Sequence, residues 1–270
     1  MIAVYILAGA LLLLLLLCIF AIFPGLRHHP DLQILKGARI AHRGLHDLAE
    51  DTPENSLAAF RAAVEAGYPI ETDLHRTADG QVVAFHDDVL TRMCGVEGVP
   101  EQMTLAQLKE LRLAGGSQQI PTLSELLELV DGKVPLLIEL KSSNAAGAAP
   151  LCEAVDPILK EYKGKYLIQS FNPLAVRWYK KNRPEVCRGQ LASAFYHEPW
   201  VQKLIGCLFF NCLTRPDFIS YDHTHAGNIF RRICRRLGGF PAGWTFRSQQ
   251  EIDAHKKDFN TFIFEGFIPD

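Results

Sequence analysis

VPLLIELK, residues 134–141, is an apolar run that ends in a carboxylate and a lysine. Short apolar runs of this kind recur along the chain and alternate with amphipathic stretches such as Ser56–Ala66 and Cys152–Lys163. This alternation is typical of βα units around a parallel sheet. The predicted strands are residues 39–42, 70–74, 135–139, 166–170, 186–191, 217–221, 240–245 and 261–264. Eight such strands predict an α/β fold, a closed (β/α)8 TIM barrel over residues 39–270.

An open, doubly wound α/β sheet is the alternative architecture. No Gly-x-Gly-x-x-Gly or phosphate-loop pattern supports it. The chain has 270 residues, enough for one large α/β domain with its own core after the first two dozen residues are set aside. The formal net charge of −2 gives no reason to expect nucleic-acid binding.

The segment after the second predicted strand departs from the parallel scheme. Gln81–Phe85 is separated from residues 70–74 by Asp79-Gly80, a strong two-residue hairpin turn. We therefore expect a hairpin over residues 70–86 in which His86 is opposite Asp73, with Cβ atoms about 4.5–5.5 Å apart. Residues 87–121 contain one weak helical stretch and are predicted to form a small insertion over the barrel mouth.

The amino-terminal segment is long and apolar. Ile2 to Phe23 contains no charged residue, and as a helix it would span about 33 Å, enough for the hydrocarbon core of a bilayer. A cleaved signal peptide is the alternative, but its apolar region would be shorter and preceded by basic residues. We predict one transmembrane anchor over residues 1–23, followed by a juxtamembrane linker over residues 24–38.

Flanking charge predicts the orientation of this anchor. Arg27, Lys36 and Arg39 follow the apolar helix, and no basic side chain precedes it. The positive-inside rule then places the globular domain in the cytoplasm, at the cell membrane, as a single-pass protein. Seven cysteines without Cys-x-x-Cys spacing agree with a reducing compartment.

Carboxylates gather at the predicted ends of two neighbouring strands. Glu71 and Asp73 share one strand face because strand side chains alternate, and Glu139 ends the next parallel strand. The carboxyl ends of barrel strands build the active site. Three carboxylates at one mouth would repel one another unless a cation lay among them, and oxygen ligands favour Mg²⁺ or Ca²⁺. The alternative is that one or more caps a helix or pairs with a surface lysine.

Two histidines and two cations accompany the carboxylates. His42 ends the first strand, and His86 is placed beside Asp73 by the hairpin, so both are candidates for proton transfer. Arg43 and Lys141 could hold the oxygens of one phosphate group. Together these groups suit phosphoryl chemistry, in which cations offset developing negative charge.

The order of these motifs resembles the glycerophosphodiester phosphodiesterase family over about residues 38–268. The matching elements are His42-Arg43-Gly44, Pro53-Glu54-Asn55-Ser56, Glu71-x-Asp73, Thr77-x-Asp79-Gly80, His86-Asp87, Glu139-x-Lys141 and Gln169-Ser170-Phe171-Asn172-Pro173. The resemblance implies a TIM barrel with a small insertion and hydrolysis of glycerophosphodiesters to an alcohol and glycerol phosphate. It also implies one divalent metal on Glu71, Asp73 and Glu139, acid–base catalysis by His42 and His86, and phosphate contacts from Arg43 and Lys141.

Several positions depart from the family pattern or lie outside it. Trp244-Thr245-Phe246-Arg247 and Phe264-Glu265-Gly266 replace the usual late motifs, so Trp244 is a candidate pocket residue and the roles of Arg247 and Glu265 are open. Glu54 is a second candidate pocket residue. Asn55 is expected to cap or anchor the first helix. His75 is expected at the solvent-exposed surface.

The sequence is compatible with three functions. The first is hydrolysis of soluble glycerophosphodiesters, and the second is lysophospholipase D-type hydrolysis of membrane lysolipids. The anchor and the apolar run Trp200–Leu213 favour the second, and no catalytic motif separates the two. The third is a catalytically silent barrel that binds phosphate-bearing ligands. The basic cluster Arg231–Arg236 is either a solvated helix face or a contact with an anionic membrane.

Overall fold

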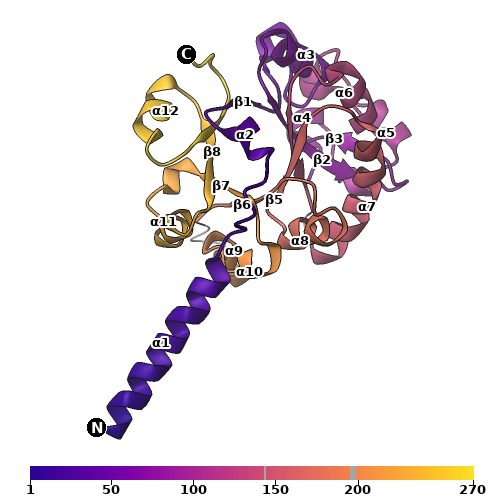
Figure 1. Ribbon diagram of the computed structural model, residues 1–270. Coiled ribbons are helices and arrows are strands. Elements are labelled where there is room, and N and C mark those ends of the chain that lie inside the picture. The colour runs from indigo at the N-terminus through magenta and orange to yellow at the C-terminus, as the bar shows by residue number, and fades with distance from the viewer. Residues whose placement is uncertain (143, 195–198) are drawn as a thin grey trace.

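The chain forms a closed barrel of eight parallel strands. The computed structural model describes residues 1–142, 144–194 and 199–270. The strands are ordered β1-β9-β8-β7-β6-β5-β4-β2, and a β1–β2 pairing closes the ring (Figure 1). They are β1 Arg39–His42, β2 Ile70–Arg76, β4 Leu136–Leu140, β5 Tyr166–Ser170, β6 Arg188–Ala192, β7 Phe218–Asp222, β8 Phe240–Phe246 and β9 Thr261–Phe264. The TIM-barrel prediction is therefore confirmed.

Helices between the strands cover the outside of this barrel (Figure 1). They are α3 Leu57–Glu65, α6 Leu123–Val130, α7 Ala145–Glu161, α8 Pro173–Asn182, α9 Trp200–Gly206, α10 Asn211–Thr214, α11 Ile229–Arg236 and α12 Gln249–His255. Local sequence fixes where several begin: Ser56 caps α3, and Thr122 with Glu125 forms a capping box on α6. Their apolar faces pack on the outward side chains of the strands in one continuous core.

The hairpin is present, but its predicted register is wrong by one residue. β3, Val82–Ala84, pairs antiparallel with β2 so that His75 is opposite Val83. The loop holds three residues instead of two, because Thr77 pairs with Gln81 and Gly80 takes a left-handed conformation with φ +83°. Asp73 is consequently opposite Phe85, whose backbone N–H donates to its carbonyl.

His86 therefore reaches the site by a different route from the one predicted. β3 ends at Ala84, and the chain leaves the sheet before His86. The segment that follows contains α4 Thr91–Cys94, η2 Pro100–Gln102, α5 Leu105–Lys109 and η3 Leu113–Gly115. It has its own apolar cluster, which includes Phe85, Leu90 and Leu108. The insertion thus packs on β3 as a small subdomain.

Residues 24–38 run across the amino-terminal end of the barrel. α2, Leu32–Leu35, places the fully buried Leu35 against residues near the start of the strands, including Leu137 and Leu167. The Arg27 guanidinium holds Asp217, with Nε 2.5 Å from Oδ1. This segment therefore closes the end of the barrel opposite the carboxyl ends of the strands.

Among the residues that the structure describes, one helix is long and apolar enough to cross a membrane. α1, Ile2–Ile22, has 21 residues and a mean hydropathy of 3.0, and its most apolar stretch is not buried by the rest of the chain. It projects away from the barrel and meets it beside α9 and α10 (Figure 1). Its last residue, Ile22, is buried against the domain.

Candidate active site

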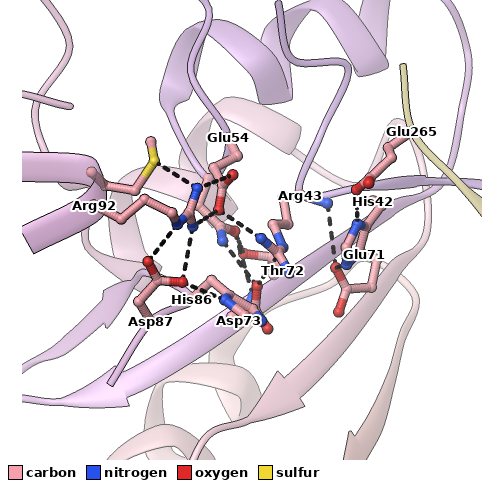
Figure 2. Close-up of polar contacts among 12 residues, drawn as sticks. His42, Arg43, Glu54, Glu71, Thr72, Asp73, His86, Asp87, Arg92 and Glu265 are labelled. Carbon is pink, nitrogen blue, oxygen red and sulfur yellow. Dashed lines mark hydrogen bonds and ion pairs between the residues drawn. The ribbon is translucent and has the colours of Figure 1, made fainter. Parts of the chain in front are cut away.

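The predicted site residues converge at the carboxyl ends of β1, β2 and β4. The register of the strands explains this placement, because His42 is level with Glu71 and Asp73 is level with Glu139. Figure 2 shows the polar contacts of part of this set, including His42 with Glu265 and the Arg43 backbone N–H with Glu71. A cavity of about 70 Å³ opens among them. It is lined by His42, Arg43, Glu71, His86, Glu139, Gln169, Phe171, Leu191, Trp244, Thr245 and Ile263.

The three carboxylates are buried together. Each of Glu71, Asp73 and Glu139 offers one oxygen, and these oxygens lie within 4.8 Å of one another. Burial and the charges of the other two raise the pKa of Glu71 well above its ordinary value. Burial likewise raises the pKa of Glu139 to about 7, against the opposing charge of Lys141. Such a cluster concentrates negative charge where water cannot screen it.

Asp73 is the carboxylate that stays ionised. Burial opposes its ionisation, but Lys141, His86 and Arg43 outweigh burial and hold its pKa well below the ordinary value. Lys141 Nζ lies 3.5 Å from Asp73 Oδ1 and 3.2 Å from Glu139 Oε1. Arg43 Nε lies 3.5 Å from Asp73 Oδ2. The two predicted phosphate-binding cations therefore flank the carboxylate cluster.

Two buried oxygens in this cluster accept no hydrogen bond from any residue that the structure describes. They are Asp73 Oδ1 and Gln169 Oε1. Gln169 is level with Glu139 on the neighbouring strand, and its Nε2 donates to Glu71 Oε1 at 3.4 Å. Buried oxygens without donors are costly unless another ligand satisfies them. The oxygen-rich donor set fits a hard divalent cation.

Each histidine is oriented by its own carboxylate. His42 Nδ1 lies 2.5 Å from Glu265 Oε2, and His86 Nδ1 lies 2.7 Å from Asp87 Oδ1 (Figure 2). These contacts assign the Nδ1 proton of each ring and leave Nε2 free to accept one. His42 Nε2 points to the carboxylate cluster, 3.9 Å from Glu71 Oε2.

Both histidines favour the neutral form. Burial lowers the pKa of His42, and the hydrogen bond to Glu265 offsets only part of that effect. Burial also lowers the pKa of His86, with the nearby Asp73 charge in partial opposition. Glu265 itself is held ionised, since the hydrogen bond from His42 overcomes burial and lowers its pKa to about 2. A neutral imidazole beside an ionised partner can take up a proton.

Glu54 acts behind Arg43 and not in the cavity. Its carboxylate accepts hydrogen bonds from Arg43 Nη1 at 2.7 Å and from Arg92 Nη2 at 2.6 Å. Arg92 also binds Asp87, with Nε 2.6 Å from Oδ2. Glu54, His86 and Asp87 form a second group of possible metal ligands, but both of its carboxylates already bind the Arg92 guanidinium. A cation therefore fits the Glu71, Asp73 and Glu139 group better.

One expectation for a neighbouring residue holds only in part, and another is wrong. Asn55 does not cap the first helix, because Ser56 does, and its Nδ2 instead donates to Asp73 Oδ2 at 2.9 Å. His75 is fully buried and not at the surface. Its Nδ1 lies 2.5 Å from Glu101 Oε1 in the insertion. The Glu101 carboxylate therefore gives the buried imidazole a charged partner.

Three residues of the site lacked an assigned role in the sequence analysis. Glu265 follows the last strand and Gln169 lies on the strand next to Glu139, so the rule that strand ends carry function could have found both. Phe171 packs edge to face on Trp244, with ring centroids 5.6 Å apart. The candidate pocket residue Trp244 accordingly lines the cavity.

A larger apolar cleft of about 620 Å³ adjoins the site. Its lining includes Glu139 and Lys141 of the site, together with Val201, Ile205 and Leu213 of α9 and α10. Four apolar side chains of the run Trp200–Leu213 therefore line this cleft, together with Gln202. The cleft has the size of ordinary small-molecule sites.

The sequence is similar to several known enzymes. Residues 42–209 match the glycerophosphoryl diester phosphodiesterase family. A glycerophosphodiester phosphodiesterase of Caldanaerobacter subterraneus is 35% identical over 62% of this chain and 71% of that protein. The Homo sapiens glycerophosphodiester phosphodiesterase 1 is 29% identical over 72% of this chain and 59% of its own length. A lysophospholipase D of Rattus norvegicus is 29% identical over 59% of this chain and 54% of its own length.

Solved structures share the barrel. A phosphodiesterase of Oleispira antarctica, in complex with its product sn-glycerol-3-phosphate, superposes with a TM-score of 0.69. It is 24% identical, and the match covers 84% of this chain and 92% of that one. A Parabacteroides distasonis glycerophosphodiester phosphodiesterase gives a TM-score of 0.67 at 23% identity, over 85% and 93% of the two chains. The resemblance drawn from the motifs is confirmed, and this chain belongs to the glycerophosphoryl diester phosphodiesterase family.

Proposed function

We propose that this chain hydrolyses glycerophosphodiesters to an alcohol and glycerol phosphate, through paired acid–base catalysis by His42 and His86. The observation that carries the proposal is that both imidazoles line the same small cavity as two of the carboxylates. Each imidazole also has its own carboxylate partner, Glu265 or Asp87. A protein that only bound phosphate would have no use for two oriented proton-transfer groups.

The chemistry divides between the two histidines. One imidazole removes the proton from the attacking oxygen as its bond to phosphorus forms. The other, protonated, donates to the leaving oxygen as the bond between phosphorus and the alcohol breaks. Arg43 and Lys141 would hold the non-bridging oxygens of the phosphate and offset their growing negative charge. Their guanidinium and ammonium groups already lie within 3.5 Å of Asp73.

One divalent cation, Mg²⁺ or Ca²⁺, would be held by Glu71, Asp73 and Glu139. The proposal is supported by the oxygen-only donor set, its burial, and the unsatisfied Asp73 Oδ1. When bound, such an ion polarises a phosphoryl oxygen and neutralises charge in the transition state. Asn55 contributes by fixing the second Asp73 oxygen, which leaves Oδ1 directed to the cluster.

A membrane lysolipid is the second candidate substrate. The observation that favours it is the apolar cleft that extends from Lys141 to α9 and α10, beside the apolar helix α1. A phosphodiester bound at the carboxylate cluster could lay its acyl chain along Val201, Ile205 and Leu213. Soluble glycerophosphodiesters have no group that would use this surface.

The barrel is proposed to be a single unit held at the cell membrane by α1. The domains would be an anchor over residues 1–23, a linker over 24–38 and the barrel with its insertion over 39–270. Arg27, Lys36 and Arg39 follow the apolar helix, which supports a cytoplasmic barrel by the positive-inside rule.

Removing either histidine should abolish most turnover without unfolding the barrel. We expect His42→Ala and His86→Ala each to lower kcat for glycerophosphocholine by about 10²–10⁴. Choline release measures the rate, and circular dichroism checks the fold. His28→Ala, at an exposed position, is the matched control and should keep full turnover. Near-normal rates in both active-site variants would rule out the proton-transfer assignment.

Metal binding should stabilise the protein through Asp73. At a free Mg²⁺ or Ca²⁺ concentration 100 times Kd, binding adds about 2.7 kcal/mol, which raises Tm by about 5–10 °C. Asp73→Asn should lose this rise, because it removes the central ionised ligand, whereas Glu128→Gln on the exposed face of α6 should keep it. Thermal melts with chelator and with each metal measure the difference. An unchanged response in Asp73→Asn would place the metal elsewhere.

The apolar cleft should matter only for substrates that carry an acyl chain. We expect Val201→Gln combined with Leu213→Gln to lower kcat/KM for lysophosphatidylcholine by about tenfold or more, as apolar contacts are lost. Glycerophosphocholine should be hydrolysed within about twofold of the normal rate. Ile229→Gln, also exposed and apolar but outside the cleft, serves as the control. Equal loss on both substrates, or none on the lysolipid, would contradict the lysolipid proposal.

Topology can be tested at the carboxyl terminus, which lies on the far side of the barrel from α1 (Figure 1). A reporter that is active only in the cytoplasm, fused after Asp270, should be active in the full chain. The chain that begins at residue 24, with the same fusion, provides the cytoplasmic reference. Activity of an externally competent reporter instead would reverse the proposed orientation.

A further inference from the structure

The junction between α1 and the barrel is held by specific polar contacts. Asn211 Nδ2 donates to the Ile22 carbonyl at 2.9 Å. Arg215 Nη1 donates to the carbonyls of Phe20 and Phe23, at 3.1 and 2.6 Å. These are carbonyls at the carboxyl end of α1, which have no partner within the helix. The barrel therefore caps the apolar helix and fixes the direction in which it leaves the domain.

A groove of about 670 Å³ lies at this junction, outside the catalytic site. One part of its wall is apolar and belongs to the last turns of α1, through Leu16, Ile19 and Phe20. Another part is formed by three arginines, Arg27, Arg188 and Arg215, of which the Arg27 guanidinium is already bound by Asp217 and the Val186 carbonyl. The Arg215 guanidinium stacks 4.6 Å from the Phe20 ring centroid, at the boundary of the two parts.

Positive charge exceeds negative charge around this groove. None of the described residues that line it is acidic. Behind it, Asp217 is already bound by the Arg27 side chain and by the Arg188 backbone N–H. Lys180 lies near the same guanidiniums: burial and the charges of Arg188 and Arg215 lower its pKa.

Arg188 supplies an independent sign of a missing ligand. Its side chain is only 5% exposed, and its Nε is buried with no hydrogen-bond partner among the described residues. Arg188 Nη1 donates to the Val186 carbonyl at 3.4 Å and is 3.9 Å from Asp217 Oδ2, so it forms no close ion pair. A buried guanidinium donor without an acceptor is costly, and an anionic oxygen in the groove would satisfy it.

We propose that this groove binds an anionic phospholipid, with the phosphate at Arg188 and Arg215 and an acyl chain along α1. The inference rests on the membrane anchoring proposed above. The apolar wall continues directly into the helix that would cross the bilayer, so the ligand is a lipid and not a free phosphate ion. Basic pockets beside transmembrane helices recognise anionic headgroups by the same combination.

Such a lipid would have a structural consequence for the enzyme. The groove and the apolar cleft are both lined by the α10 segment, since Arg215 follows that helix and Leu213 within it lines the cleft. A bound phospholipid would add contacts between α1 and the barrel, and so would hold the cleft at the membrane. The site is thus a means of orienting the catalytic domain on an anionic bilayer.

The test uses the full chain, purified in detergent and exchanged into phosphatidylglycerol or phosphatidylcholine. Native mass spectrometry should detect retained phosphatidylglycerol on the wild type, in preference to phosphatidylcholine. Arg215→Ala should reduce the retained phosphatidylglycerol about fivefold, the effect of one basic residue at an anionic surface. Arg215→Lys should recover part of it. Arg61→Ala, exposed on α3 across the barrel from α1, is the charge-matched control and should retain it fully (Figure 1).

A second variant is needed because Arg215→Ala also removes the hydrogen bonds that cap the carboxyl end of α1. Leu26 lines the groove and is 48% exposed, so Leu26→Glu places a carboxylate there without disturbing the core. It should lose phosphatidylglycerol, whereas Leu26→Gln should retain it. Retention unchanged in Leu26→Glu, equal retention of phosphatidylcholine, or displacement by inorganic phosphate would overturn the proposal.

Hydrolysis of glycerophosphocholine by the same preparations keeps this inference separate from the proposed activity. Wild type, Arg215→Ala and Leu26→Glu should hydrolyse it at equal rates, because the groove contains no residue of the catalytic cavity. Lipid retention without hydrolysis would count against the catalytic proposal alone. The intact mass measured in the same experiment shows whether α1 is still attached, and a chain cleaved after α1 would contradict the anchoring.

Discussion

The burial of an ionised Asp73 is the constraint on which the rest of the site depends. A carboxylate with no exposed surface is unstable unless its charge is balanced, and here Arg43 and Lys141 come from two other strands to do so. Asn55, from the turn before α3, satisfies the other oxygen. Because these partners belong to separate βα units, the charge is stable only when the barrel is closed and in register.

The same closure assembles the two histidines proposed to transfer protons. His42 lies on the first strand, but the carboxylate that orients it, Glu265, follows the last strand. Pairing of β1 with β9 brings them within 2.5 Å. His86 instead has its partner next to it in the chain, in Asp87, and is supported by the insertion. One imidazole is thus positioned by the barrel and the other by a local loop.

The two ends of the barrel differ in the residues that occupy them. The candidate catalytic groups lie at the carboxyl ends of the strands, whereas the amino-terminal end is closed by α2 through Leu35. The apolar helix joins on the side, at α10, where Arg215 caps its last turn. This separation would let the proposed membrane contact and the proposed hydrolysis coexist in one small domain. It also places the apolar cleft between them.

The sequence by itself determined the barrel, the apolar helix and most of the cavity, because strand periodicity and strand-end motifs are local signals. It could not determine the hairpin register: a Thr77 hydrogen bond lengthened the loop by one residue and moved His86 relative to Asp73. Only the tertiary structure decided that Glu265 orients His42, that His75 is buried against Glu101, and that Arg188 lacks an acceptor. Each of these depends on contacts between distant segments, which no local pattern encodes.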